Sequence, residues 1–256
     1  MEKGKLQFLN RFNYLMSALH FLQALLVMYL SSPDKGVAPL TINFLKFDTV
    51  LRKLLPSSAE IGSVNLAWFI VIFFLLSSLA HLFIATVYRQ TYEKNLMLGI
   101  NKIRWFEYAF SASVMMIAIS LLSGIYDLSS LIMIFALDSI MNLLGLAMEQ
   151  VNQGRKQVTW LSFILGCIAG IIPWLVFGIY VYGAQQYGGG NIPSFVYWIY
   201  VSIFIFFNSF AINMILQYKK VGPWKDYLFG EKVYIILSLV AKSLLAWQVF
   251  AGTLRP

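Results

Sequence analysis

The sequence predicts an all-α membrane protein built as one bundle of seven transmembrane helices. Two properties of the composition indicate a membrane setting: 59% of the 256 residues are hydrophobic and only 12% are charged, with a mean hydropathy of +0.73. A soluble domain is usually about 45–50% apolar and about 25% charged. The third observation is that seven segments are long and apolar enough to cross a bilayer core of about 30 Å as helices.

The seven segments cover most of the chain and are mostly joined by short connections. They span residues 12–30, 61–88, 105–125, 128–148, 158–182, 195–218 and 233–254. The first could be read as a cleaved signal peptide, because three basic residues precede it. Its apolar run is longer than a signal core, however, and it lacks a clear small-residue cleavage site. We therefore expect a single domain over residues 1–256.

The one long connection is 31–60. It is too long for a simple helix-to-helix loop and is expected to have structure of its own. Residues 38–51 are rich in β-branched and aromatic side chains, which favours a short β-hairpin. The hairpin could form a lid over the helix ends, a dimer contact, or both, and the lid is the favoured interpretation.

The basic residues gather on one side of the predicted bundle. Thirteen of the 19 Lys and Arg residues lie in the N-terminal tail and in the second, fourth and sixth connections, and five lie on the other side. The positive-inside rule then predicts a cytoplasmic N-terminus, an extracellular C-terminus and an extracellular 31–60 loop. The net charge of +8 is accordingly assigned to topology in the cell membrane, and no nucleic-acid partner is expected.

Only three charged residues fall inside the predicted spans: Glu107, Asp138 and Lys242. A charge at a helix centre costs about 2.5–3.5 kcal/mol on insertion scales, so each is a candidate for a functional site. Lys242 lies near the middle of the last helix. It could form a structural ion pair, or its amine could bind an aldehyde as a Schiff base.

Glu107 is the expected partner of Lys242. If the third helix begins near residue 97, Glu107 lies about 15 Å from the cytoplasmic end, and Lys242, counted from residue 231, lies about 16 Å from it. Ser111 and Ser238 are each one helical turn away from one member of the pair. Both hydroxyls are therefore expected to face it.

Further polar side chains occupy the cytoplasmic half of the first two helices. His20 and Gln23 continue a stripe at helical spacing from Asn13, and His81 has serines one turn before it. We expect His20, His81 and Gln23 to line a polar cavity there. No third ligand for a metal is evident, and Cys167 is the only cysteine, so neither a metal site nor a disulfide is expected.

The outer halves of the helices look different. Residues 114–123, 128–137, 172–182 and 244–251 contain no Asp, Glu, Lys, Arg or His. Pumps and transporters usually place titratable groups along the whole path across the bilayer. A continuous proton path is therefore not expected.

Four sequence stretches make the chain similar to the heliorhodopsins. They are RWFEY at 104–108, GCIAGIIPW at 166–174, FFNSFA at 206–211 and LSLVAKS at 237–243. The resemblance covers essentially the whole chain, and the last stretch is the most specific. Heliorhodopsins are inserted in the membrane upside down relative to ordinary microbial rhodopsins, and the distribution of charges predicts the same orientation.

The resemblance implies a retinal site. All-trans retinal would be bound to Lys242 as a protonated Schiff base, with Glu107 as its counterion. The residues near it would be Tyr108, Ser111 and Ser238 at the Schiff base and Met115, Met141 and Phe206 as pocket walls. Asp138 departs from the family pattern, which has Asn there. The neutral form of Asp138 would resemble Asn in shape, so retinal binding is still expected.

The expected function is that of a light-sensing photoreceptor with a slow photocycle, which signals rather than pumps. Its expected partners are membrane lipids, a second copy of the chain and a cytoplasmic signalling protein. The alternatives are a light-driven ion or proton transporter and a retinal-free bundle with a plain ion pair. Ordinary outward pumps carry a second carboxylate eleven residues after the counterion, where this chain has Ala118. An enzyme is not expected, because no catalytic dyad, metal-binding set or phosphate loop is evident.

Overall fold

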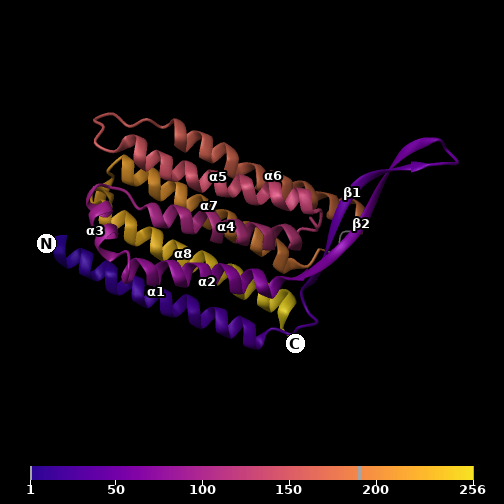
Figure 1. Cartoon of the computed structure of the whole chain (residues 1–256), viewed down its shortest axis with the longest axis horizontal. Coiled ribbons are helices and arrows are strands. Elements are labelled where there is room, and N and C mark those ends of the chain that lie inside the picture. The colour runs from indigo at the N-terminus through magenta and orange to yellow at the C-terminus, as the bar shows by residue number, and fades with distance from the viewer. Residues whose placement is uncertain (1, 190–191, 256) are drawn as a thin grey trace.

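The computed structural model describes residues 2–189 and 192–255 and confirms seven helices long and apolar enough to cross a membrane. They are α1 (Glu2–Leu30), α2 (Leu66–Ala85), α4 (Lys102–Leu122), α5 (Leu128–Asn152), α6 (Leu161–Tyr187), α7 (Ser194–Tyr218) and α8 (Tyr227–Val249). A turn of 3-10 helix, η1 (Gly222–Lys225), precedes α8, and a turn of π-helix, η2 (Phe250–Leu254), follows it. The helices lie side by side along the long axis of the molecule (Figure 1).

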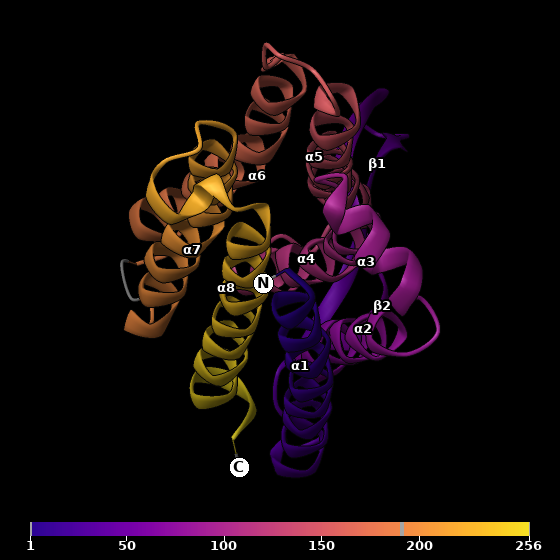
Figure 2. The ribbon, with the colours of Figure 1, turned by 90° about the vertical axis from the view of Figure 1, so that its left-hand side faces the viewer.

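Most helices that follow one another in the sequence also pack together. Helix α1 packs on α2, α2 on α4, α4 on α5, α5 on α6 and α7 on α8, and α8 returns to α1. Figure 2 views the bundle from the end that holds the N-terminus. The largest apolar core lies among these helices and includes the buried rings of Phe73, Phe74, Trp174 and Phe177.

The outer surface of the bundle is apolar. Large hydrophobic side chains stand exposed on several helices, including Leu79 on α2, Ile132 on α5, Leu175 on α6 and Ile205 on α7. A soluble monomer rarely exposes a continuous apolar surface. This surface agrees with a multi-pass membrane protein, in which it faces lipid.

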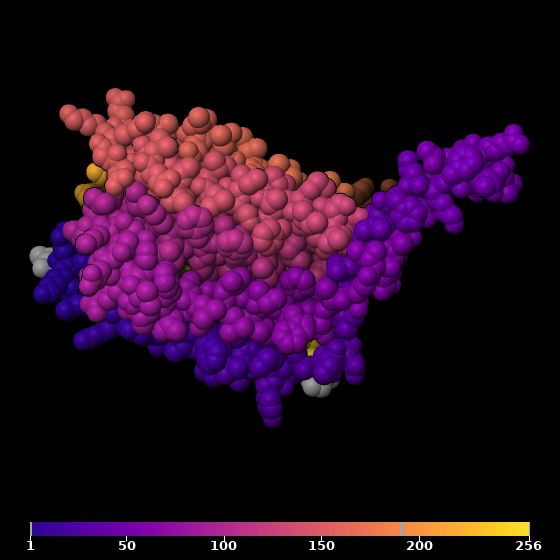
Figure 3. All heavy atoms as spheres, viewed as in Figure 1, coloured from indigo at the N-terminus to yellow at the C-terminus, as the bar shows by residue number. Residues whose placement is uncertain are grey.

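The segment before α2 forms a long antiparallel hairpin of β1 (Val37–Asp48) and β2 (Lys53–Asn65). At its tip the Asp48 carboxylate accepts hydrogen bonds from the backbone N–H groups of Val50 and Leu51, both at 2.8 Å. The hairpin is longer than the one predicted within 38–51. Its outer part projects away from the bundle (Figures 1 and 3), so the expected lid over the helix ends is wrong for that part.

Two predicted helix starts are wrong. The second span was expected to begin at residue 61, but β2 continues to Asn65, whose side chain accepts a hydrogen bond from the N–H of Ala67 at 2.8 Å and caps α2. The depth of Glu107 was counted from a start of the third helix near residue 97, ahead of its apolar segment 105–125. That region instead forms the short helix α3 (Arg89–Met97), and α4 begins only at Lys102.

Candidate functional site

Helices α8 and α4 bring Lys242 and Glu107 together near the middle of the bundle. The Lys242 Nζ donates hydrogen bonds to Glu107 Oε1 at 3.0 Å and to Ser238 Oγ at 2.8 Å. The two charged side chains are 3% and 7% exposed. Ser238 precedes Lys242 by four residues, and side chains at this spacing lie on the same face of a helix.

Glu107 has a serine partner that was not predicted. Ser77 of α2 donates to Glu107 Oε1 at 2.6 Å. Ser111 is fully buried, and its hydroxyl has no hydrogen-bond partner among the residues that the structure describes. Ser77 belongs to the polar group one turn before His81, which was the only sign in the sequence that α2 could reach the carboxylate.

The charged groups of Lys242 and Glu107 meet as expected, but their distances from the helix starts differ from the expected ones. Counted from the observed helix starts, Glu107 lies five residues into α4, about 7.5 Å, and Lys242 fifteen residues into α8, about 22 Å. Helical side chains point back toward the N-terminus. The Lys242 amine accordingly lies beside Ser238, one turn nearer the start of α8, and this accounts for part of the difference.

A cavity lies against the amine of Lys242. Five helices line it: α4, α5, α6, α7 and α8. Six of the nine expected chromophore-site residues are on its wall, namely Tyr108, Met115, Asp138, Met141, Ser238 and Lys242. Phe206 is not among the lining residues, and the next residue, Phe207, takes that place. Successive helical residues point about 100° apart, and a Phe-Phe pair does not reveal which ring faces inward.

The cavity fits a long apolar aldehyde. Most of its lining is hydrophobic, and the Lys242 amine is at its wall. Gly145 contributes no side chain, and a Cβ there would collide with the ring of Trp105, which is also part of the lining. Apolar walls with a few polar groups are typical of sites for small organic ligands. Cys167 of α6 lines the same cavity and is also exposed on the surface.

Asp138 of α5 is a second carboxyl group at this cavity and is fully buried. Its Oδ2 accepts a hydrogen bond from Ser113 Oγ at 3.1 Å and one from Asn142 Nδ2 at 3.2 Å. Its Oδ1 is buried and has no partner within residues 2–189 and 192–255.

The two histidines lie together, but Gln23 lies elsewhere. The rings of His20 and His81 stack with centroids 5.6 Å apart, and His81 Nδ1 lies 2.7 Å from Asn13 Oδ1. Gln23 instead accepts a hydrogen bond from Trp247 Nε1 of α8 at 3.2 Å. In the described part of the chain, no group of three His, Cys, Asp or Glu side chains could hold a metal ion.

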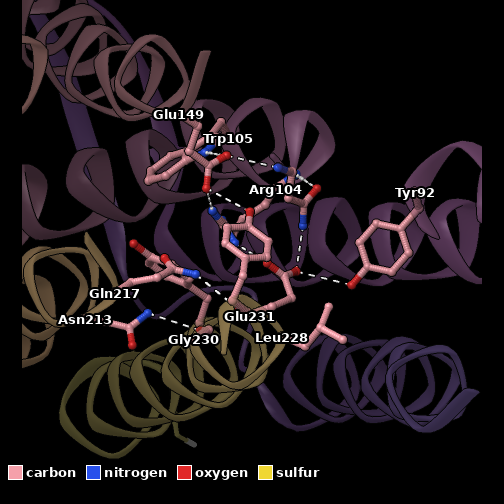
Figure 4. Close-up of polar contacts among 12 residues, drawn as sticks. Tyr92, Arg104, Trp105, Glu149, Asn213, Gln217, Leu228, Gly230 and Glu231 are labelled. Carbon is pink, nitrogen blue, oxygen red and sulfur yellow. Dashed lines mark hydrogen bonds and ion pairs between the residues drawn. The ribbon is translucent and has the colours of Figure 1, made fainter. Parts of the chain in front are cut away.

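A buried ionic network near the N-terminal end of the bundle was not predicted (Figure 4). The Arg104 guanidinium pairs with both Glu149 of α5 and Glu231 of α8, and each of the three side chains is at most 3% exposed. These charges flank the predicted apolar segments and were assigned to connections. Helices α4, α5 and α8 extend beyond those segments and carry the charges inward, where the single cation of Arg104 lies between the two carboxylates.

Polar neighbours complete this network. Asn101 Nδ2 donates to Glu231 Oε1 at 2.6 Å, and the Tyr92 hydroxyl donates to the same oxygen at 3.2 Å. Burial and the nearby charge of Glu231 raise the pKa of Tyr92 well above its usual value. Tyr92, on the connecting helix α3, therefore stays a hydrogen-bond donor over the physiological pH range.

Trp105 joins the network to the cavity. Its Nε1 donates to Glu149 Oε2 at 2.7 Å, while its ring lines the cavity and meets Tyr108 and Tyr234 edge-on. The side chain therefore has one polar end in the network and an apolar face toward the cavity.

The fold and site define a class, the seven-helix proteins of the microbial rhodopsin fold. The chain is similar to cyanorhodopsin from the cyanobacterium Tolypothrix sp. NIES-4075, with 11% identity, a TM-score of 0.65 and coverage of 96% of this chain and 92% of that one. It is also similar to a light-driven proton pump from Leptosphaeria maculans, with 15% identity, a TM-score of 0.60 and coverage of 95% of each chain. No curated protein matches the chain.

The chain belongs to the heliorhodopsin family, whose sequence profile matches residues 9–254. This membership confirms the resemblance seen in the sequence. Together with the rhodopsin fold, it implies a retinal chromophore and a light-responsive membrane protein.

Proposed function

We propose that the protein is a photoreceptor that holds all-trans retinal covalently on the amine of Lys242, with Glu107 as the counterion. The observation that carries the proposal is the buried amine of Lys242, which lies 3.0 Å from Glu107 at the wall of an apolar cavity. When bound, retinal supplies light absorption and isomerisation. Membership of the heliorhodopsin family supports this choice of chromophore.

The chain's own residues have separate roles in this proposal. Glu107 balances the positive charge at the Lys242 nitrogen, and the hydroxyls of Ser77 and Ser238 hold the two members of the pair in position. The apolar walls exclude water, which strengthens the interaction between the two charges. The stacked His20 and His81 are the nearby groups that could receive a proton from this region.

We assign the output to signalling at the cytoplasmic face. In the proposed orientation, the N-terminal end of the bundle is cytoplasmic, and the network around Arg104 lies near that end. Trp105 connects this network to the cavity, so a change in the shape of the chromophore can reach it. No enzymatic role is proposed. A homodimer is also part of the proposal, with the exposed apolar side chains of the hairpin as its contact, Phe44 and Phe47 among them.

The deciding experiment is the addition of all-trans retinal to the purified Lys242→Ala variant. We expect no visible pigment, because the nitrogen that binds the aldehyde is gone. The matched control is Lys232→Ala on the same helix, which should form the pigment, because that amine lies over the ring of Phe8 and away from the cavity. A visible pigment in Lys242→Ala would overturn the proposal.

A second measurement distinguishes the proposed photoreceptor from the alternative, a light-driven ion or proton transporter. Illuminated cells that contain the wild-type pigment should show no sustained change in external pH and no photocurrent. A sustained change that Lys242→Ala abolishes would support transport and would reject signalling as the main function.

A further inference from the structure

The proposed mechanism leaves one buried titratable group at the chromophore cavity without a role. Asp138 is fully buried on α5 and lines the same cavity as Lys242. The other titratable side chains on its wall are Tyr108 of α4, Cys167 of α6 and Lys242 of α8. Asp138 and Lys242 are thus the two lining residues that can carry a full charge of opposite sign.

The charge of Asp138 has no cation of its own. Within residues 2–189 and 192–255, Lys242 is the only basic side chain on the cavity wall, and it pairs with Glu107. Among the described residues, no salt bridge includes Asp138. A carboxylate here would add a negative charge to the cavity, and few solvent molecules or ions would screen it.

The hydrogen-bonding groups around Asp138 accommodate both of its protonation states. The Ser113 hydroxyl, 3.1 Å from Oδ2, can donate to a carboxylate or accept from a carboxylic acid. In the second case its own proton can turn to the carbonyl oxygen of Ala109 at 2.7 Å. Asn142 Nδ2 reaches Oδ2 at 3.2 Å in either state. The side chains around Asp138 therefore accommodate the gain or loss of a proton, exchanged with solvent, by the rotation of one hydroxyl.

We propose that Asp138 is a second colour-determining group of the retinal site and that its ionisation shifts the absorption of the pigment independently of the counterion. The inference rests on the proposed function. Light excitation moves positive charge along the retinal chain, away from the nitrogen, so the excitation energy depends on the charges that line the cavity. Glu107 acts at the nitrogen. Asp138 lies in a separate set of hydrogen bonds with Ser113 of α4 and Asn142 of α5.

The test is a pH titration of the absorption spectrum of the purified retinal-bound protein. The wild-type pigment should show a reversible shift with an isosbestic point that Asp138→Asn lacks and Glu107→Gln retains. Asn keeps the shape of the side chain but cannot ionise. Identical titrations of wild type and Asp138→Asn would overturn the inference about Asp138 and would leave the proposed function standing. A wild-type protein that forms no pigment would overturn the proposed function as well.

A second pair of variants tests the inference even if Asp138→Asn fails to fold. Ser113→Ala removes a hydroxyl that contacts Asp138, whereas Ser139→Ala removes a neighbouring hydroxyl that contacts Ser113 and the Ala109 carbonyl. The midpoint of the spectral transition should move more in Ser113→Ala than in Ser139→Ala. Equal midpoints in both variants and the wild type would reject Asp138 as the titrating group.

Discussion

At the scale of single residues, the ion pair of Lys242 and Glu107 depends on its hydroxyl partners. Ser238 and Ser77 supply one hydrogen bond to each member of the pair, from α8 and α2. Removing one member of a buried pair costs about 3–5 kcal/mol, because the other charge is left without a partner. In the retinal-bound protein the same imbalance would appear at the chromophore nitrogen.

The variant Glu107→Gln should form a pigment that absorbs at a longer wavelength. The negative charge of Glu107 stabilises the ground state, in which the positive charge lies at the nitrogen, and an amide stabilises it less. The check is the absorption maximum under conditions in which the nitrogen remains protonated. Glu93→Gln on α3 is the control, because Glu93 pairs with Arg89 at the surface. An unchanged maximum would remove Glu107 from the counterion role.

The sequence predicted the members of the pair better than their surroundings. Lys242 and Glu107 are conspicuous because charges are rare in apolar helices, and Ser238 follows from helical spacing on α8. The contact of Ser77 with Glu107, and the choice of Phe207 over Phe206 at the cavity, depend on how each helix is rotated about its axis. Helices with apolar residues all round give little information about rotation.

At the scale of secondary-structure elements, Asp127 joins the hairpin to the start of α5. Its carboxylate accepts hydrogen bonds from the backbone N–H and the hydroxyl of Ser130, at 2.9 and 3.0 Å, and caps the helix. It also accepts from Asn43 of β1 at 3.1 Å. Hydrogen bonds to the ionised form, led by that from the Ser130 backbone, lower the pKa of Asp127.

The variant Asp127→Ala should have a lower melting temperature at neutral pH, since loss of a helix N-cap costs about 1 kcal/mol. Because the pKa of Asp127 is lowered in the folded protein, its contribution is present above the unfolded-state pKa. It is lost as the pH falls through the folded-state pKa. The difference in melting temperature between wild type and variant should therefore narrow in acid.

Asp34→Ala serves as the matched control for this prediction. Asp34 is an exposed carboxyl in the turn before β1, and its replacement should change the melting temperature little. An equal effect of the two substitutions, or an Asp127 effect that does not depend on pH, would contradict the assigned role.

The network of Arg104, Glu149 and Glu231 gives a second prediction at the element scale. Trp105→Phe keeps an aromatic ring at the cavity but removes the hydrogen bond to Glu149. Glu149 Oε2 keeps the hydrogen bond from the Asn101 backbone N–H at 2.9 Å, but a hydrogen bond to a charged group is worth about 1.5–3 kcal/mol, so the melting temperature should fall. Light-induced infrared difference bands of carboxyl groups should also decrease. Trp198→Phe is the control, because Trp198 is 66% exposed on α7. Unchanged bands in Trp105→Phe would contradict a coupling of the Arg104 network to the chromophore through Trp105.

At the scale of the whole molecule, the arrangement of the helices does not determine which end of the bundle faces the cytoplasm. The distribution of basic residues predicts it. Basic residues are concentrated at the end of the bundle that holds the N-terminus, and the hairpin projects near the other end. We propose that the first end is cytoplasmic, in agreement with the positive-inside rule. The hairpin would then lie outside the cell.

Reporter fusions in bacteria test this orientation. A green fluorescent protein fused to the N-terminus should fluoresce, and an alkaline phosphatase fused to the C-terminus should be active, because each reporter works on one side of the membrane. The reversed fusions should be inactive. Activity only in the reversed pair would contradict the orientation and would place the Arg104 network toward the outside.

The global architecture was more predictable than its connections. The seven spans follow from the length of apolar segments alone, and the structure confirms them. The second strand of the hairpin was missed, because residues 53–65 include Pro56, three serines and Gly62 and show weak alternation. Helix α3 was missed because it is short and polar. The buried ionic network was missed because helices continue beyond their apolar segments.

Cys167 gives the molecule a built-in position for chemical labelling. It is the only cysteine of the chain, and it reaches both the outer surface of α6 and the wall of the cavity. A thiol reagent has a single possible attachment point on this protein, with no engineering required. Because Cys167 borders the cavity, a label attached there would report on the neighbourhood of the chromophore.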